Sequence, residues 1–459
     1  MSKGKRHFAR KRPKQALQQK SAPDATPQLV EIMKPLYGGQ FLARHEGKAV
    51  FVPLTLPGEQ VRVRITEDKK SYSVAEPVEI VHASADRTTP QCPHFGACGG
   101  CNYQHASYEL QLAMKESILR ETLMRSGVTP TEKVDVLAAD PWAYRNRIRL
   151  AFDAQGNAGY RGRRSHAIVP ICECPIAAPT LVSAAKIIAE VCRNESPLLR
   201  LNELSLFCNH DESAMLATLF AAGGDQEPAR KKHESIFRDI AAQVPALTGA
   251  ELGAEGDEDH PACTIAQWGD SSINYHAAGA DFRVDHGAFF QVNRFLIDAL
   301  IDRVIAQHNG AVAWDLFAGV GLFARQLAKG FAKVVAVESA PSAVAALEAN
   351  LNGTTASAVR STTLDFLRSV AEPGKRVGAI ERPDLVVVDP PRAGLGPEVT
   401  ALLGQIAPTA IAYVSCDPAT LGRDLKTLIQ SGYAIDSIAL ADLFPQTYHL
   451  ESVVKLHHS

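Results

Sequence analysis

The chain has 459 residues, a formal net charge of −2 and 46% hydrophobic residues. This length exceeds what one hydrophobic core usually organises, so we expect two or three domains. The small net charge excludes a polycation, so any nucleic-acid contact must come from local basic patches. No apolar run reaches the roughly 18 residues of a transmembrane helix, so we expect a cytoplasmic protein with no membrane association. In that compartment, clustered cysteines serve metal binding or catalysis more often than disulfides.

Residues 1–28 are predicted to form a basic disordered tail. The segment MSKGKRHFARKRPKQALQQK contains eight Lys or Arg residues and no acid. It lacks the apolar stretch of a secretory signal, and its charge is compatible with RNA contact.

Residues 29–84 predict a small β-barrel, similar in pattern to oligonucleotide-binding (OB) barrels. Val61, Val63 and Ile65 alternate with Arg62 and Arg64, and glycines and prolines divide the segment into short strands. Barrels of this kind bind nucleic acids in some proteins and are purely structural in others. The pattern leaves both roles open.

Residues 85–275 predict a central α+β domain that contains a cysteine cluster. CPHFGACGGC supplies Cys92, Cys98 and Cys101, and CPI supplies Cys174. Four thiolates suit either an iron–sulfur cluster or zinc. Zinc sites usually pair two Cys-x-x-Cys knuckles, and this segment has one. The spacing therefore favours an iron–sulfur cluster and leaves zinc open.

Residues 276–459 predict an α/β doubly wound, Rossmann-like domain. Apolar strands such as KVVAVE, DLVVVD and TAIAYVS alternate with helix patterns such as SAVAALEANL. This alternation is typical of a parallel sheet with helices on both faces. Ligands of such folds bind at the carboxyl edge of the sheet, so polar residues directly after these strands are candidate site residues.

The segment WDLFAGVGLFA joins one such strand to a helix and predicts a nucleotide-type cofactor site. Gly319 and Gly321 remove side chains where a ligand approaches the backbone. Glu338, at the end of the next strand, is placed to accept hydrogen bonds from ribose hydroxyls. Asp389 follows the strand of DLVVVDPPRAG, where two prolines stiffen the loop. A plain tight turn is the competing interpretation of the glycines.

Cys416, in YVSCDPATLGRDL, follows the next strand and is expected at the same edge of the sheet. A lone cysteine is most often a buried core residue. Here a helix pattern begins just downstream, and a helix N-terminus lowers the pKa of a thiol. A thiolate beside a methyl donor suits methylation at carbon 5 of a pyrimidine, because addition at carbon 6 makes carbon 5 nucleophilic. A general base must then remove the carbon-5 proton, and Glu451 in YHLESVV is the best candidate.

Together, FFQVN, DLFAGVGLF, VVVDPPRAG, YVSCDPATLGRDL and HLES resemble the RNA uracil-5-methyltransferases, which depend on S-adenosylmethionine. The resemblance implies that Cys416 is the nucleophile and Glu451 the base. It also implies a methyl-donor pocket beside the glycine loop, lined by Gln291, Phe317, Glu338, Asp365 and Asp389. Family members often carry Asn at the positions of Leu322 and Asp417.

The resemblance extends upstream of this domain. Family members with this cysteine pattern carry a [4Fe-4S] cluster, which implies that Cys92, Cys98, Cys101 and Cys174 hold one here. The N-terminal barrel resembles the RNA-binding TRAM barrel that precedes some of these enzymes. The family modifies ribosomal and transfer RNA. Barrel and cluster together favour 23S ribosomal RNA as the partner, with transfer RNA as the alternative, and we expect a monomer.

Two basic segments predict further RNA contact. YRNRIRL places Arg145, Arg147 and Arg149 on one face of a strand, and YRGRRSH adds three arginines. Tyr144 and Tyr160 beside them are candidates for base stacking. A non-catalytic RNA-binding protein would explain these segments, but not the candidate nucleophile and cofactor loop. A radical S-adenosylmethionine enzyme would need three cysteines at a tighter spacing.

Overall fold

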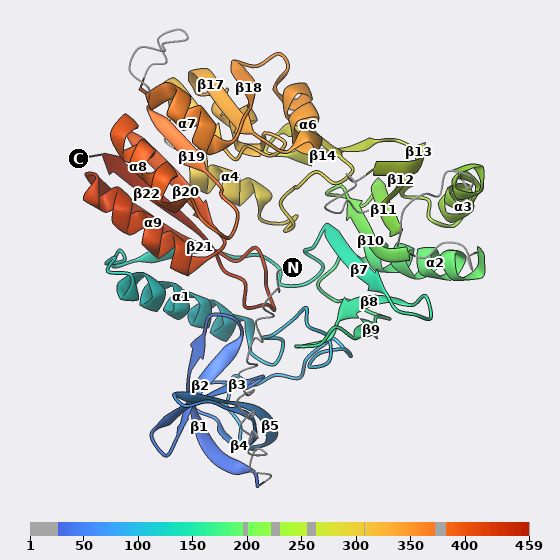
Figure 1. Cartoon of the computed structure of the whole chain (residues 1–459), viewed down its shortest axis with the longest axis vertical. Coiled ribbons are helices and arrows are strands. Elements are labelled where there is room, and N and C mark those ends of the chain that lie inside the picture. Colours follow the sequence, from blue (N-terminus) through green and yellow to red (C-terminus); the bar gives the residue numbers. More distant parts are fainter. Residues whose placement is uncertain are drawn as a thin grey trace, which may run out of the picture. The chain divides into compact units, whose positions relative to one another are not determined.

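The computed structural model describes residues 26–195, 201–221, 230–254, 263–306, 308–371 and 382–458 (Figure 1). Its contacts divide the chain into two compact units. The first comprises the described residues up to Lys34 together with Phe41–Ala83, and the second comprises Pro35–Gln40 and Ser84–Ser459. The predicted tail lies almost entirely outside the described residues.

The first unit is a closed five-stranded barrel in the order β1-β2-β3-β5-β4. Its strands are β1 (Gln28–Leu36), β2 (Gln40–His45), β3 (Lys48–Pro53), β4 (Gln60–Asp68) and β5 (Tyr72–His82). In β4 the three aliphatic residues are buried and the arginines between them are exposed, as the alternating pattern predicts. The predicted barrel is therefore confirmed.

The second unit contains an eight-stranded sheet in the order β18-β17-β16-β19-β20-β22-β21-β6. The first five of these strands run parallel, whereas β22 runs antiparallel to both β20 and β21. The strands are β16 (Gly310–Leu316), β17 (Phe331–Glu338), β18 (Ala356–Arg360), β19 (Leu385–Val388), β20 (Ala410–Ser415), β21 (Tyr433–Ala441), β22 (Glu451–His458) and β6 (Val134–Leu137). The parallel strands are apolar almost throughout because helices cover both of their faces.

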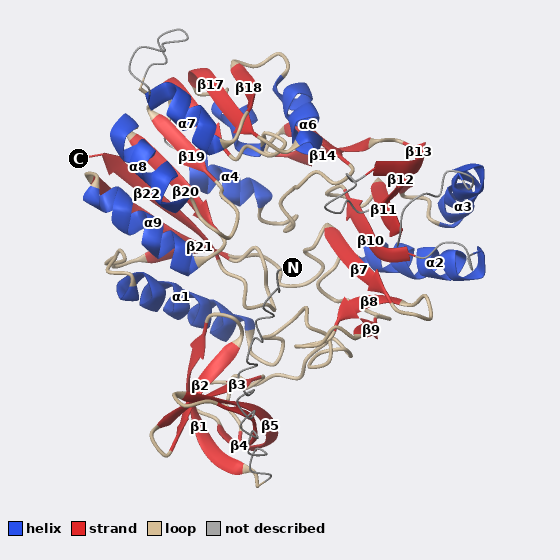
Figure 2. Cartoon of the chain, in the orientation of Figure 1, coloured by secondary structure: helices blue, strands red, loops and turns tan. Residues whose placement is uncertain are grey.

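Helices pack on this sheet (Figure 2), and two hydrophobic cores flank it, one on each face. One core contains α4 (Ile297–Ile305), α5 (Leu322–Leu327) and α6 (Pro341–Leu351). The other contains α7 (Thr363–Ala371), α8 (Gly396–Ile406), α9 (Pro418–Gln430) and α1 (Tyr108–Arg125). The predicted doubly wound architecture is present, and it places the ends of β16, β17, β19 and β20 at one edge.

Residues assigned from the sequence to the central domain contribute to this same sheet. Strand β6 pairs in parallel with β21, with Ile438 opposite Val134, and Leu119 of α1 lies in the core that also contains α9. These contacts join segments about 300 residues apart in the sequence. They depend on long-range packing, which a local sequence pattern does not indicate.

The remaining sheet of the second unit has seven strands in the order β13-β12-β11-β10-β7-β8-β9. Its strands are β7 (Arg147–Phe152), β8 (Ala158–Arg161), β9 (Ile168–Pro170), β10 (Leu201–Cys208), β11 (Met215–Ala221), β12 (Leu247–Ala254) and β13 (Cys263–Gly269). Helices α2 (Pro179–Glu195) and α3 (Arg230–Gln243) pack on it around a third core, and β14 (Ser272–Ala277) and β15 (Ala280–Asp285) form a separate hairpin. This sheet forms the predicted α+β region. Within the described ranges, no helix is long and apolar enough to cross a membrane.

Candidate active site

The glycine loop between β16 and α5 leaves open space above its backbone. Phe317, Gly319 and Gly321 all have positive φ angles, of 67°, 55° and 91°. A Cβ atom added to Gly319 would meet nothing within 4 Å, whereas one added to Gly321 would lie 2.8 Å from Leu347. Gly321 is therefore required for packing against α6. The position of Gly319 leaves room for a ligand to approach the backbone.

Glu338 lies beside this loop, as its place at the end of β17 predicts. Its Oε2 accepts a hydrogen bond of 2.9 Å from the Gly319 N–H, and its Oε1 accepts from the N–H groups of Ser339 and Ala340. The next strand, β18, leads to Asp365 in the first turn of α7. Asp365 is exposed, and its carboxylate accepts a hydrogen bond of 2.7 Å from the Thr362 hydroxyl. Both acids thus lie at the carboxyl edge of the sheet.

Asp315 is an acid of this edge that the sequence interpretation did not include. It lies in β16 and is fully buried, and its Oδ2 accepts a hydrogen bond from the Ala324 N–H. Its Oδ1 has no partner among the described residues. Burial raises its pKa to about 7, and Asp389 and Glu338 act in the same direction. The signal in the sequence was an acid inside the apolar run AVAWDLF.

Gln291 and Asp389 meet although they are 98 residues apart. The Gln291 Nε2 donates a 3.2 Å hydrogen bond to Asp389 Oδ2. Burial raises the pKa of Asp389 to about 7, although this hydrogen bond opposes the shift. The FFQVN and DPPRAG motifs therefore form one polar site directly after β19.

The strand register brings Cys416 and Glu451 to neighbouring strand ends. Ser415, the last residue of β20, pairs with Ser452 in the antiparallel strand β22. Cys416 follows Ser415 directly, Glu451 precedes Ser452 and is 5% exposed, and the charge of Glu451 acts on the Cys416 thiol. The Oε1 of Glu451 has no hydrogen-bond partner among the described residues. Burial raises the pKa of Glu451 well above its ordinary value, with Asp389 adding to the shift and Arg392 opposing it.

The expectation that the α9 N-terminus would lower the pKa of Cys416 is wrong. The pKa of the thiol is raised to about 12, first by burial and then by the charges of Glu451 and Asp389. The first N–H groups of α9 are already bonded to Asp417, whose Oδ1 accepts from Ala419 and Thr420 at 3.0 Å. Asp417 thus serves as the helix N-cap.

Three residues around Cys416 were not among the predicted site residues. Arg392 lowers the pKa of both Cys416 and Glu451, and its guanidinium lies 3.0 Å from His449 Nδ1. Burial, followed by the charge of Arg392, lowers the pKa of His449 to about 4, so this imidazole is neutral at physiological pH. Tyr37, in the segment Pro35–Gln40 that groups with the second unit, donates a 3.2 Å hydrogen bond to the Cys416 carbonyl. Arg392 was visible in the sequence as the cation of DPPRAG.

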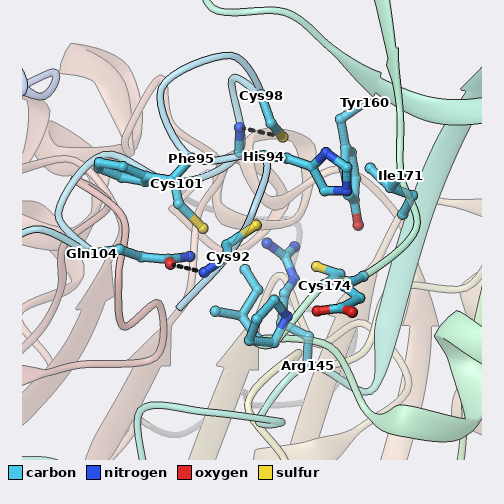
Figure 3. Close-up of a pocket in the computed structure, with 14 residues that line it drawn as sticks. Cys92, His94, Phe95, Cys98, Cys101, Gln104, Arg145, Tyr160, Ile171 and Cys174 are labelled. Atoms are coloured by element: carbon cyan, nitrogen blue, oxygen red, sulfur yellow. Dashed lines mark hydrogen bonds between the residues drawn. The ribbon is translucent and has the colours of Figure 1, made fainter. Parts of the chain in front are cut away.

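The four predicted cluster cysteines line one small pocket. Figure 3 shows their sulfur atoms turned toward a shared space. The pocket has a volume of about 40 Å³, and Phe95, Ile171 and Ile176 help to enclose it. Burial raises the pKa of all four thiols, and charges on neighbouring thiols raise it further. Among the described residues, no three His, Cys, Asp or Glu side chains are grouped as ligands of a single metal ion.

The residues that line this pocket suit a negatively charged group bound by thiolates. Arg145 lines the pocket and carries a buried Nε with no partner among the described residues (Figure 3). Burial lowers the pKa of Arg145, but the neighbouring Tyr144, Tyr160 and Cys174 outweigh it and leave that pKa raised. A cation held beside four thiol groups would compensate the charge that thiolates bring into a buried site. These residues therefore fit a thiolate-bound cluster.

The structure corrects the assignment to RNA contact for part of the two basic segments, namely Tyr144, Arg145 and Arg147. Tyr144 is fully buried and its hydroxyl donates to the Pro445 carbonyl, so it cannot stack on a base. Arg145 faces the cysteine pocket, and Arg147 packs over the Phe207 ring at 4.4 Å. Arg161 and Arg164, at the tip between β8 and β9, are exposed. The sequence pattern did not separate packing arginines from exposed ones.

Two family models match the chain. The model described as tRNA (Uracil-5-)-methyltransferase matches residues 271–459, and the TRAM domain model matches residues 27–78. The solved structure of Pyrococcus abyssi tRNA (uracil-54, C5)-methyltransferase in complex with S-adenosyl-L-homocysteine is similar, with a TM-score of 0.72 and 26% identity. That similarity covers 93% of this chain and 100% of the other.

Curated relatives match over nearly the full length. The 23S rRNA (uracil(1939)-C(5))-methyltransferase RlmD of Pectobacterium atrosepticum is 33% identical, covering 92% of this chain and 91% of the relative. The RlmD protein of Klebsiella pneumoniae is 34% identical, covering 91% and 92%. An uncharacterized RNA methyltransferase of Streptomyces avermitilis is 34% identical, covering 93% and 97%. The chain therefore belongs to the RNA uracil-5-methyltransferase family and is an S-adenosylmethionine-dependent enzyme.

Proposed function

We propose that this enzyme methylates carbon 5 of a uridine in 23S ribosomal RNA, with Cys416 as nucleophile and Glu451 as general base. The observation that carries the proposal is the electrostatic interaction between Cys416 and Glu451, which directly adjoin the paired residues Ser415 and Ser452 of β20 and β22. The charge of Asp389, which accepts a hydrogen bond from Gln291, acts on both residues. Strand β19 alone separates β20 from β16, where the glycine loop begins.

The reaction uses these two residues one after the other. The Cys416 thiolate adds to carbon 6 of the uracil, and the electron pair moves toward carbon 5. S-adenosylmethionine supplies the methyl group, so that S-adenosylhomocysteine leaves. Glu451 then accepts the carbon-5 proton, the carbon 5–carbon 6 double bond re-forms, and the thiolate departs. Because carbon 5 and carbon 6 are inside a helix stack in paired RNA, the target nucleotide must be flipped out.

Glu451 must be ionised before it removes that proton. Burial and Asp389 hold the pKa of Glu451 well above its usual value, whereas Arg392 favours the charged form. We propose that the positive charge of Arg392 partly offsets the negative charges that appear when the Cys416 thiolate and the Glu451 carboxylate form. The neutral His449 beside it accepts the hydrogen bond from the guanidinium and so orients it.

We further propose that Cys92, Cys98, Cys101 and Cys174 hold a [4Fe-4S] cluster. The four thiols that line one pocket and the buried cation of Arg145 support this assignment. Four cysteines would saturate the irons, so the cluster would be structural. Iron and sulfide analysis of the purified protein, with its visible absorption, tests this assignment.

Ribosomal RNA is proposed over transfer RNA because the similar RlmD proteins are named for 23S ribosomal RNA and match almost end to end. The Pyrococcus relative, named for transfer RNA, makes transfer RNA the second candidate. Incubation with each RNA, transcribed without modifications, and labelled methyl donor decides between them. Label incorporated into transfer RNA alone would overturn the ribosomal assignment.

The mechanism is tested with RNA that contains 5-fluorouridine. Fluorine cannot leave as a proton, so the reaction should stop as a covalent protein–RNA adduct that survives denaturation. We expect this adduct in the wild type and its loss in Cys416→Ala. If the wild type methylates uridine RNA yet forms no adduct on the fluorinated RNA, Cys416 is not the nucleophile.

A further inference from the structure

The loop between β21 and β22 is anchored by residues that lie outside the candidate active site. It spans residues 442–450 and leads directly into Glu451. Gln446, Thr447 and Leu450 in this loop are each at most 2% exposed. Because the Glu451 Oε1 has no partner among the described residues, its position depends on the backbone of this loop rather than on its own hydrogen bonds.

Gln446 is the point at which this loop is fixed. Its carbonyl accepts two hydrogen bonds, from the Asn102 N–H at 2.9 Å and from the Tyr103 N–H at 3.0 Å. Gln446 and Gln111 of α1 also form two reciprocal hydrogen bonds, both of 3.0 Å. Gln111 Nε2 donates to Gln446 Oε1, and the Gln446 N–H donates to Gln111 Oε1. Four hydrogen bonds therefore converge on one buried residue.

The backbone of Gln446 supports the same interpretation. Its φ angle is 69°, in the left-handed region that non-glycine residues seldom occupy. Such a conformation is strained for a residue with a side chain and persists only where surrounding contacts determine it. The two N–H donors come from the residues directly after Cys101, so the cysteine segment helps to impose this conformation.

We propose that Gln446, fixed by Gln111 and by the cysteine segment, is a positioning residue for Glu451. This inference rests on the proposed roles of Cys416 and Glu451. Gln446 is not itself one of the reacting groups. Its fixed backbone determines where strand β22 begins, and therefore where the Glu451 carboxylate lies. Loosening this loop should impair the final proton removal and spare thiolate addition and methyl transfer.

The prediction has a specific signature on ordinary uridine RNA. In Gln111→Met, which keeps side-chain length but loses the reciprocal bonds, methylated RNA should remain covalently bound to Cys416. We expect resolution of this adduct to slow by about 10- to 100-fold, the range that misplacement of a general base produces. Adduct formation on 5-fluorouridine RNA should stay within about twofold of the wild type, because it ends before proton removal.

Gln446→Asn provides a second variant, because Asn tolerates a positive φ but is too short to reach Gln111. Gln326→Met is the matched control: Gln326 is also a buried glutamine, in α5, but no hydrogen bond connects it to this loop within the described parts of the chain. It should resolve the adduct as the wild type does. The adduct is quantified on denaturing gels, with folding checked by circular dichroism.

The outcomes separate this inference from the proposed function. Without a wild-type adduct on 5-fluorouridine RNA, the proposed mechanism itself fails. If that adduct forms but both glutamine variants release methylated uridine RNA at the wild-type rate, the positioning role of Gln446 is wrong. Equal slowing of adduct formation and resolution would also overturn it, since general loosening of the fold would then explain the effect.

Discussion

The ionisation of Cys416 is controlled by charged neighbours that act in opposite directions. The pKa of the thiol is raised to about 12: burial, Glu451 and Asp389 raise it, and Arg392 lowers it. A thiol with this pKa is protonated at neutral pH. Because the thiolate is the attacking species, these neighbours determine how readily the first step begins.

Glu451→Gln should lower the pKa of Cys416, because it removes the carboxylate that contributes most after burial. It should also leave methylated uridine RNA covalently attached to the enzyme, because no group remains to take the carbon-5 proton. The pH dependence of Cys416 alkylation by iodoacetamide, followed by mass spectrometry, measures the first effect. An unchanged alkylation profile would mean that Glu451 does not act on the thiol.

Arg392→Gln should shift the same thiol in the opposite direction. Loss of the cation removes the charge that favours the thiolate, so the pKa of Cys416 should rise. We expect alkylation at pH 8 to slow by roughly 3- to 10-fold, given that one pKa unit corresponds to a tenfold change in thiolate. Arg368→Gln, which removes an exposed arginine of α7 paired with Glu398, serves as the control. Equal rates in both variants would exclude a specific role for Arg392.

At the scale of elements, helix α1 is attached to the C-terminal sheet by a fully buried ion pair. Lys115 Nζ lies 2.6 Å from Asp442 Oδ1, and both side chains are 0% exposed. The Tyr108 hydroxyl donates to the other oxygen of Asp442, and Lys115 also donates to the Phe444 carbonyl. The charges of the pair are thus compensated by hydrogen bonds at both ends.

Lys115→Met should destabilise the protein by about 3–5 kcal/mol, because it leaves the Asp442 carboxylate buried without its partner. Adding Asp442→Asn should recover a large part of that loss, since the double variant buries no unpaired charge. Urea unfolding of the two single variants and the double variant measures the coupling. Purely additive effects would show that the two residues do not stabilise each other.

The elements of the C-terminal domain could be predicted because each leaves a local signature. Strands such as DLVVVD and helix starts such as DPATL carry their apolar runs and caps within a few residues. The addition of β6 beside β21 and of α1 beside α9 could not be predicted. These contacts depend on long-range packing, and the four residues of β6 carry too short a pattern to specify a partner strand.

At the scale of the whole molecule, motifs adjacent to strand ends located most of the candidate site. Parallel strands bring their carboxyl ends together, so Gly319, Glu338, Asp389 and Cys416 could be grouped without knowing any distance. The direction of the Cys416 pKa shift could not be predicted. It depends on burial and on two acids from other strands. The roles of Tyr144 and Arg145 were missed for a similar reason, because only the folded chain shows that they face inward.

Asp315 makes the stability of the whole molecule depend on pH. Its pKa is about 7 in the folded protein against an ordinary value of 3.8, so the folded state holds this proton more tightly than the unfolded state does. Stability should therefore fall as the pH rises through the interval between these two values. Asp389, also raised to about 7, contributes with the same sign.

Asp315→Asn should remove the Asp315 part of this dependence while its amide oxygen still accepts from the Ala324 N–H. At pH 4, close to the ordinary pKa of 3.8, little of this ionisation cost is present, so the two proteins should differ little. At pH 8 the wild type buries a charge, and the variant should gain about 2–4 kcal/mol relative to it. Urea unfolding at both pH values measures this change. If the free energies of unfolding of the two proteins changed with pH in the same way, Asp315 would be ionised at no net cost. A positive group or a water network would then have to lie beside its unpaired Oδ1.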